Sequence, residues 1–340
     1  MSWLMPSETA AHERTWMAFP CAGEALGGAD QATYAAWAEV ANAVVRFEPV
    51  AMLVDPTEIG RARALLDPSV ELYETPVDEC WLRDHGPTFV LDPEQPGKLG
   101  AVDWIFNGWG DRGWAKWERA AAHARFVAEL AGAELISSTL INEGGGFHVD
   151  GEGTVLLTET VQLDHNRNPY ASKERVEAEL ARTLGTSQAI WLPRGLSRDY
   201  DDYGTNGHVD IVATITAPGQ LLLHMQNNPA HPDYELTRQL RELLSAQRDA
   251  AGRSFQITEL PAPTEIYEDQ QFVDYSYVNH LVVNGGVIAC GFGEEAADGQ
   301  AREILAEAYP GREVVTVDAR PIFAAGGGIH CITQQQPKRS

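Results

Sequence analysis

Basic residues are scarce in this 340-residue chain, in which 25 Lys and Arg stand against 49 Asp and Glu and give a net charge of −24. Such an excess of negative charge repels nucleic acid and anionic membranes and steers small cations toward the protein, although solubility alone explains it equally well. Long apolar runs are missing too: no stretch reaches the roughly 18 residues of a membrane helix, and the first residues lack a secretory signal. These absences predict a cytoplasmic protein without nucleic-acid or membrane partners.

Cysteine is also rare, with only Cys21, Cys80, Cys290 and Cys331. Four scattered cysteines exclude a disulfide scaffold, and none has the close spacing of a zinc site, so reduced thiols are expected. Cys290 lies in the apolar run "GGVIACGFG", as a packing thiol does, whereas Cys331 directly follows the glycines of "AAGGGIHCITQQQP". We therefore expect Cys331 to be presented to a ligand and the other three to be structural.

What the chain has instead is a repeat. Segments centred on a histidine recur at spacings of 63, 60, 72 and 50 residues, and their centres are His85, His148, His208, His280 and His330. Most are flanked by β-branched runs that are typical of strands, and helical patterns follow from Trp114, Ser172, Pro232 and Ala296. Ser172 is a candidate N-cap, Pro232 fits a first turn, and Gly185 and Gly311 are candidate stops. Each unit thus reads strand, turn, strand, helix, strand.

The fifth unit is split between the two ends of the chain. No helix follows the motif at His330, and the helix from Gln31 has no motif before it, so joining the ends would complete the unit. A ring of repeats closes in this way. We predict an α/β protein with a single domain over residues 1–340, a ring of five αβ units whose histidine-bearing loops meet near the axis. A doubly wound parallel sheet is the alternative, weakened by the lack of G-x-G-x-x-G after the first strand.

The mouth of such a ring would hold a set of reactive side chains: Arg83, Asp84, His85, Glu143, His148, His208, Asp210 and Cys331. A cysteine nucleophile needs a histidine within hydrogen-bond reach, and His208 and His330 are the candidates. If the segment is extended, neighbouring side chains point to opposite faces, which favours His208. Asp210 lies two residues beyond His208 and can orient its imidazole or bind substrate.

Carboxylates around a thiol raise its pKa unless a cation arrives, so the substrate should carry the positive charge. A guanidinium suits this site, because its planar fork of N–H donors pairs with carboxylates and its central carbon accepts a thiolate. The residues therefore predict a small cationic guanidino substrate.

The chain resembles the agmatine deiminase family, guanidino-group-modifying enzymes with the five-bladed αβ-propeller (pentein) fold. The resemblance rests on segments that occur in family order: "HERTWMAFP", "WLRDHGPTFV", "FNGWG", "EGGGFHVDGEG", "NRNP", "TNGHVD", "SYVN" and "GGGIHCITQQQP". It implies that Cys331 is the nucleophile and His208 the general acid and base, while Asp84, Glu143 and Asp210 hold the guanidinium, the last two also counting as catalytic. Trp81, just before Arg83 and Asp84, is expected to wall the substrate channel.

The implied reaction turns agmatine and water into N-carbamoylputrescine and ammonia through a covalent thiouronium adduct, with no metal or organic cofactor. Arginine, peptidyl-arginine, a guanidino acid, or amidino transfer to an amine remain alternatives. Gly328, Phe147 and His85 depart from the family pattern and are expected to shape the pocket wall around the substrate tail.

Two other classes of function stay open. A metal-dependent hydrolase would take its ligands from His148, His208, Asp150, Asp210 and Glu143. A binding module without catalysis would hold polyamines or guanidines in an acidic mouth. In the enzyme reading, His85 and His148 are structural, and Trp104, Trp109 and Trp114 belong mostly to the core. Exposed outer helices predict a homodimer.

Overall fold

The computed structural model describes residues 3–22, 31–265, 267–268 and 271–339. Its strands and helices repeat one pattern: two antiparallel strands, a helix, and a third strand that pairs in parallel with the second. Four units follow one another along the chain, and their elements are β4 (Thr88–Leu91), β5 (Leu99–Ile105), α5 (His123–Ala131), β6 (Glu134–Ile141); β7 (Phe147–Val149), β8 (Thr154–Thr158), α7 (Lys173–Leu184), β9 (Gln188–Leu192); β10 (Ala213–Ala217), β11 (Gln220–Met225), α8 (Asp233–Ala246), β12 (Gln256–Pro261); and β15 (Leu281–Val283), β16 (Gly286–Gly291), α9 (Glu295–Ala308), β17 (Glu313–Asp318).

The two ends of the chain form the fifth unit, as the repeat predicts. β18 (Thr333–Pro337) pairs antiparallel with β1 (His12–Ala18), with Met17 opposite Thr333. After α1 (Gln31–Val44), β2 (Val50–Val54) pairs in parallel with β1, and α2 (Ile59–Leu65) leads to the edge strand β3 (Glu71–Glu74). The same strand order therefore occurs five times.

The described strands form small separate sheets of three or four strands, plus the two-stranded pair β13 (Tyr267–Glu268) and β14 (Gln271–Phe272). Each of the larger sheets mixes antiparallel and parallel pairs. A doubly wound fold would have one continuous parallel sheet. That alternative is therefore wrong, and the architecture is mixed α/β.

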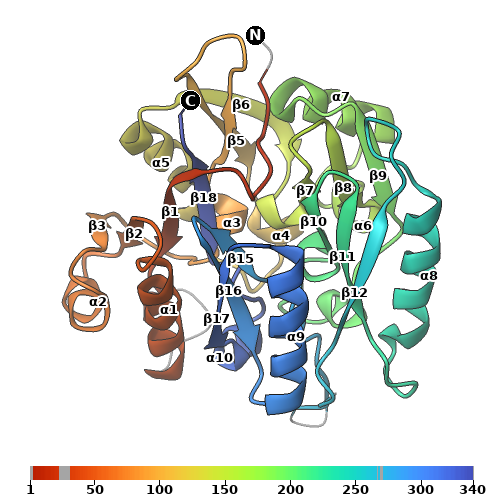
Figure 1. The fold of residues 1–340 in the computed structure, drawn as a ribbon. Helices are drawn as coiled ribbons and strands as arrows, with labels where there is room; N and C mark the ends of the chain where they lie inside the picture. The colour runs from red at the N-terminus through yellow and green to blue at the C-terminus, as the bar shows by residue number, and fades with distance from the viewer. Residues whose placement is uncertain (1–2, 23–30, 266, 269–270, 340) are drawn as a thin grey trace.

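The long helices lie around the outside and the sheets lie further in (Figure 1). Helix α7 illustrates why its sequence folds in this way. Its apolar residues Val176, Leu180 and Leu184 recur every fourth position and are buried against the sheets. The Ser172 side chain accepts the Arg175 N–H, and Gly185 ends the helix with φ of 73°, as both were predicted to do.

Other helix limits differ from the sequence-based expectation. The segment from Trp114 begins as a loop, and helix forms only at Ala120–Ala122, followed by α5. The helix starts there because the Asp78 carboxylate accepts the backbone N–H groups of Arg119 and Ala120, at 2.7 and 2.8 Å. A distant carboxylate thus sets this helix start, which local patterns do not reveal. Pro232 directly precedes α8, and α9 ends at Ala308, before Gly311.

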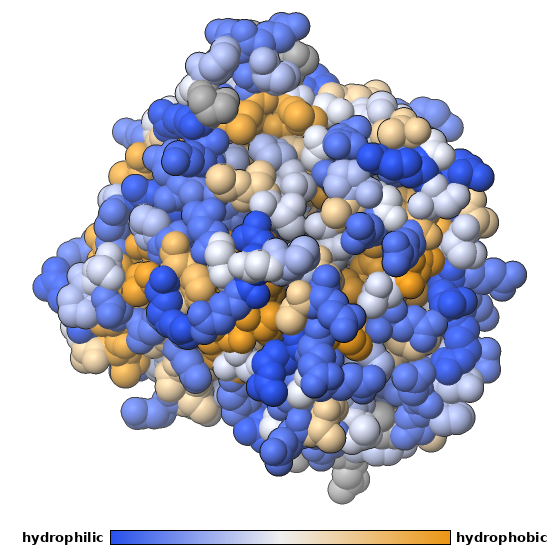
Figure 2. Space-filling view, viewed as in Figure 1, coloured by the Kyte–Doolittle hydropathy of each residue, from blue (hydrophilic) through white to orange (hydrophobic). Residues whose placement is uncertain are grey.

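The surface agrees with the acidic composition. Hydrophilic side chains cover most of the face in Figure 2, with smaller apolar areas between them. Among the helices of the described ranges, none combines the length and the apolar character that crossing a bilayer demands.

Candidate active site

The reactive side chains lie in equivalent places, in the segment just before the first strand of each unit. These segments are α3 (Leu82–His85) before β4, η3 (Gly144–Gly146) before β7, η5 (Val209–Ile211) before β10, and the residues leading to β15 and β18. They carry Asp84, Glu143, His208, Asp210, Asn279 and Cys331. The recurring histidines of the sequence mark this repeated position.

Hydrogen bonds join these segments to one another. The Asp84 Oδ1 atom accepts the backbone N–H of Gly145 at 3.0 Å. The Asn279 side-chain amide donates to the Asp210 carbonyl at 3.3 Å, and the backbone N–H of Arg83 donates to the Cys331 carbonyl at 3.1 Å. All five units therefore contribute to one site.

The Cys331 thiol lies between two polar partners. Its Sγ atom is 3.4 Å from Asp210 Oδ2, to which it donates, and 3.3 Å from the Asn279 Nδ2 atom. The segment around it is a turn and not the extended strand of the prediction. His330 therefore also reaches Asp210 Oδ2, at 2.9 Å, although only Cys331 of the two lines the adjoining cavity.

Asp210 has one engaged and one open oxygen. Oδ2 accepts from His330 and Cys331, whereas Oδ1 is buried without a hydrogen-bond partner. A buried carboxylate oxygen without a donor is costly, so an N–H donor on a ligand would be bound strongly there. The backbone at Asp210 is a 3₁₀ turn, and the hydrogen bonds of its side chain go to His330 and Cys331 rather than to His208. Of the two roles expected for Asp210, this geometry favours substrate binding over orientation of the imidazole.

Glu143 is the residue that contacts and orients the His208 imidazole. Its Oε2 atom is 3.3 Å from His208 Nε2, and both of its oxygens accept the Arg167 Nε–H, at 2.9 and 3.1 Å. Because its oxygens are already engaged and its side chain is fully buried, Glu143 is placed to position His208. The geometry gives no support to direct binding of the substrate by Glu143.

Burial and neighbouring charges set the protonation states. Burial lowers the pKa of His208, but the carboxylates of Asp84 and Glu143, and then Asp210, outweigh it and raise the pKa to about 9. Burial, together with Asp210 and Glu143, raises the pKa of Asp84 to about 6 against the effect of His208. Burial, then Asp210 and Asp84, holds the pKa of the Cys331 thiol well above its usual range. These shifts favour a protonated His208 and a neutral Cys331 thiol at pH 7.

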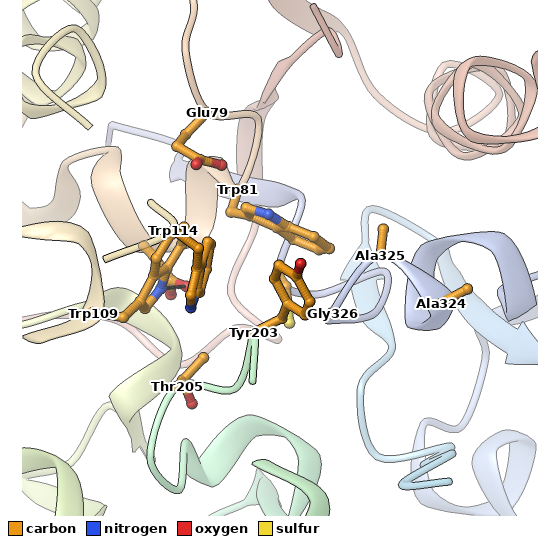
Figure 3. Close-up of a pocket in the computed structure, with 11 residues that line it drawn as sticks. Glu79, Trp81, Trp109, Trp114, Tyr203, Thr205, Ala324, Ala325 and Gly326 are labelled. Carbon is orange, nitrogen blue, oxygen red and sulfur yellow. Dashed lines mark hydrogen bonds between the residues drawn. The ribbon is translucent and has the colours of Figure 1, made fainter. Parts of the chain in front are cut away.

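A cavity of about 300 Å³ leads to Cys331 (Figure 3). Its wall is largely aromatic, and its lining residues are Glu79, Trp81, Asp84, Trp109, Trp114, Tyr203, Thr205, Ala324, Ala325, Gly326 and Cys331. Trp81 lines it as predicted. Trp109 and Trp114, expected in the core, line it too: Trp109 donates to Asp84 Oδ2 at 2.8 Å, and Trp114 stacks on Trp109.

The three departures from the family pattern lie elsewhere. Phe147 packs on Trp104, and His85 lies between Phe106 and His123. A Cβ atom at Gly328 would be 2.3 Å from Asn279 Oδ1, so glycine is needed there for the backbone to pass that amide. None of the three is among the lining residues, so the expectation that they shape the cavity wall is wrong.

A second buried cluster adjoins the site. Glu8 Oε1 contacts His330 Nε2 at 2.8 Å and lies 3.7 Å from His148 Nδ1 and 3.6 Å from Arg83 Nη1. Within the described ranges, this Glu8, His148 and His330 group is the one whose ligand atoms lie close enough to hold a metal ion. The ligand set predicted for a metal hydrolase is therefore not gathered. His148 instead contacts Thr214 Oγ1 at 2.9 Å, as a structural histidine does.

Several of these residues could not be assigned a role from sequence patterns. Asn279 and Arg167 lie in "SYVN" and "NRNP", which marked the family resemblance without a function attached, and Glu8 and Glu79 had no signal. Their partners are distant in sequence: Glu8 and His330 are separated by 322 residues. Membership of a family motif could have indicated a functional role for Asn279 and Arg167, but not for Glu8 or Glu79.

Arg167 should be essential for stability. Its guanidinium is buried and also donates to Asp164 Oδ2 at 2.8 Å and to the Thr205 carbonyl at 2.7 Å. Arg167→Met leaves the fully buried Glu143 carboxylate without its cation, which typically costs about 3–5 kcal/mol. We expect the free energy of unfolding from urea titration to fall by that amount.

A matched control is Arg241→Met. Arg241 pairs with Glu259 on the surface, where both side chains are about half exposed, so a loss of at most about 1 kcal/mol is expected. Equal losses in the two variants would contradict the structural role of the buried pair.

Known proteins resemble this chain over nearly its whole length. The model of the Porphyromonas-type peptidyl-arginine deiminase family matches residues 4–337. A Streptomyces coelicolor homologue is 53% identical over 341 residues, covering 99% of this chain and 100% of its own, and the agmatine deiminase of Stutzerimonas stutzeri is 39% identical over 356 residues, covering 98% and 95%. The solved agmatine deiminase of Enterococcus faecalis superposes with a TM-score of 0.92 at 31% identity, covering 100% of this chain and 97% of its own. The chain belongs to the Porphyromonas-type peptidyl-arginine deiminase family.

Proposed function

We propose that this protein hydrolyses the guanidino group of agmatine to give N-carbamoylputrescine and ammonia. The observation that carries the proposal is the Cys331 thiol at a cavity that also exposes the Asp84 carboxylate, beside an Asp210 oxygen that has no partner. The agmatine deiminases of S. stutzeri and E. faecalis, which match over nearly the whole chain, support agmatine as the substrate.

The guanidinium is held by Asp84 and Asp210. Asp210 Oδ1 is the free acceptor for one N–H group, and the planar fork of a guanidinium suits a pair of carboxylates. Trp109 fixes the orientation of Asp84 by its hydrogen bond to Oδ2. The substrate carbon is thereby presented to the Cys331 sulfur.

Binding of the cation also activates the nucleophile. Burial and the two aspartates keep the pKa of the empty site's thiol high. A guanidinium between the same aspartates cancels their effect on the sulfur and favours the thiolate. The thiol therefore loses its proton to solvent water mainly when substrate is bound.

The first half of the reaction forms a covalent adduct. The Cys331 sulfur attacks the guanidinium carbon, a C–S bond forms, and one C–N bond breaks. His208, whose pKa near 9 keeps it protonated at neutral pH, donates a proton to the departing nitrogen, which leaves as ammonia. An S-alkylthiouronium on Cys331 remains.

The second half regenerates the thiol. His208, now neutral, takes a proton from a water molecule, whose oxygen attacks the adduct carbon. The C–S bond breaks, and the ureido product leaves. Glu143 holds the imidazole through Nε2 during both steps, as its 3.3 Å contact with His208 supports.

The fold proposed for this reaction is a closed five-bladed αβ-propeller that forms one domain over the whole chain. The fivefold repeat of strand order and the β1–β18 pairing support it. The four cysteines are buried and scattered along the chain, which fits a reducing compartment, the cytoplasm. The homodimer expected from the outer helices remains a proposal.

The proposal is tested with the wild-type protein and a panel of substrates: agmatine, arginine, 4-guanidinobutyrate and a blocked arginine peptide, each with and without a chelator. We expect ammonia and ureido product from agmatine in both conditions. Turnover of another member of the panel in preference to agmatine would overturn the substrate assignment. Loss of turnover with the chelator would favour the metal-dependent alternative, and ammonia that forms only with an added amine acceptor would favour amidino transfer.

A further inference from the structure

The cavity has a second carboxylate besides Asp84. Its lining residues include Glu79 and Asp84 as the charged side chains and, in the described part of the chain, no basic one. Glu79 is only 3% exposed, and its Oε2 atom is buried without a hydrogen-bond partner. The reaction mechanism gives Glu79 no task.

The surroundings of Glu79 differ from those of a structural carboxylate. Asp78, its neighbour, accepts two backbone N–H groups at 2.7 and 2.8 Å, which explains that acid as a helix cap. Glu79 has no salt bridge among those found for the described residues, and Figure 3 shows its carboxylate directed toward Trp81 and Trp114. A buried carboxyl oxygen without a donor is costly, so a ligand group that donates a hydrogen bond, above all a cation, would be bound here.

The aromatic wall supports a cation at the same place. Trp81, Trp109, Trp114 and Tyr203 line the same cavity as Glu79 and Cys331. Aromatic walls accept an aliphatic chain, and their faces also attract an ammonium group. The cavity thus suits a molecule with a guanidinium at one end, methylene groups in the middle and a second cation at the other end.

We propose that Glu79 is the specificity-determining residue of this enzyme and that it binds the terminal ammonium group of the substrate. The inference rests on the proposed deiminase function. The Glu79 carboxylate would favour agmatine over guanidino compounds whose tail is neutral or anionic. Arginine and 4-guanidinobutyrate carry a carboxylate at this end, and Glu79 would repel it.

Protonation of Glu79 supports the same role. Burial, and next the negative charge of Asp78, raise the pKa of Glu79 to about 8, against a backbone N–H of Lys116 that lowers it. The other titratable neighbour is Cys80, a buried thiol whose pKa is itself raised. In the empty cavity the carboxyl is therefore mostly neutral at pH 7, and a bound ammonium favours its ionised form. Binding of the tail should release a proton.

The test uses agmatine and pentylguanidine, in which a methyl group replaces the terminal ammonium. The substitution Glu79→Gln keeps the shape of the side chain and removes its ability to carry a negative charge. We expect kcat/KM for agmatine to fall at least about 30-fold, mainly through KM, because the loss of one partner of a buried charge pair is costly. For pentylguanidine, kcat/KM of the variant should remain within about threefold of the wild-type value. Glu129 is an exposed acid on α5, and Glu129→Gln controls for the change in net charge. This variant should leave kcat/KM unchanged for both substrates.

A second measurement needs only the wild type. The ratio of kcat/KM for agmatine to that for pentylguanidine cancels the pH dependence of the catalytic groups, which act on the same guanidinium. Since the tail binds ionised Glu79, the ratio should rise by up to about tenfold per pH unit below pH 8 and level off above it. This readout stands even if Glu79→Gln does not fold.

The outcomes separate the two proposals. If the wild type turns over neither compound, the deiminase function fails. If the wild type prefers agmatine and Glu79→Gln keeps that preference, or loses activity equally on both compounds, the role of Glu79 is overturned while the deiminase function stands. A ratio that does not change with pH would also overturn it.

Discussion

Replacement of Cys331 by alanine is expected to abolish deimination, with a fall in kcat of roughly 10⁵- to 10⁶-fold, the scale seen when a covalent nucleophile is lost. The reason is that Cys331 is the one thiol among the described side chains that line the cavity, and the Thr205 hydroxyl there already donates to the Asp199 carboxylate at 2.6 Å. Ammonia release from agmatine measures the loss. Wild type quenched with acid during turnover should also contain a protein species heavier by the substrate less ammonia, and Cys331→Ala should not.

The variant should nevertheless fold and bind. Cys331 occupies little space, and Asp84 and Asp210 remain to hold the guanidinium, so calorimetric binding of agmatine to Cys331→Ala should persist without turnover. Cys21→Ala is the matched control, a buried thiol away from the cavity, and should retain activity. Turnover by Cys331→Ala within tenfold of the wild type would contradict a covalent mechanism.

The repeated part of this fold was predictable because its signals are local. Alternating apolar strands, a serine at a helix start and a glycine such as Gly185 at a helix end each act within a few residues. Five histidine motifs with similar surroundings then indicated five similar units, and the unmatched ends indicated that the two termini complete one of them. The β1–β18 pairing agrees with that expectation.

The site was only partly predictable because its contacts are not local. Asp84, His208, Asp210 and Cys331 could be named from their motifs, but not which atoms meet. Glu143 illustrates this: the sequence left Asp210 with two possible roles, to orient His208 or to bind substrate, and the structure has a 3₁₀ turn at Asp210 and the His208 contact at Glu143. A change of backbone conformation by one turn redirects a side chain completely.

The aromatic wall shows a second limit. Trp109 is 3% exposed, so burial alone is consistent with a core residue. It lines the cavity because its backbone has φ of 58° and its indole reaches Asp84. A positive φ at tryptophan is rare, and no sequence pattern predicts it. Tertiary contacts decided its role.

Gly145 explains how tightly the site is built, and it supplies the second large expected effect. The residue lies in η3, and a Cβ atom there would be 2.6 Å from His208 Nδ1, 2.9 Å from Asp84 Oδ1 and 3.0 Å from Asp210 Oδ2. Glycine is thus required for close approach of three side chains from two other units, Asp84 from one and His208 and Asp210 from the other. Its φ is not in the left-handed region, so the constraint is space and not backbone conformation.

Gly145→Ala should therefore lower kcat/KM for agmatine on the order of 10³-fold, because one added methyl displaces the general acid and both substrate carboxylates, and a displacement of about 1 Å at one of them already costs about 10²-fold. Gly60→Ala is the matched control: Gly60 lies in α2, a Cβ there meets nothing within 4 Å, and alanine favours a helix, so activity should be unchanged and stability equal or higher. The measurement is kcat/KM for agmatine, determined by steady-state kinetics for both variants and the wild type. If Gly145→Ala stays within about fivefold of the wild type, the three side chains have room to move, and the rigid arrangement from which the mechanism is derived does not hold.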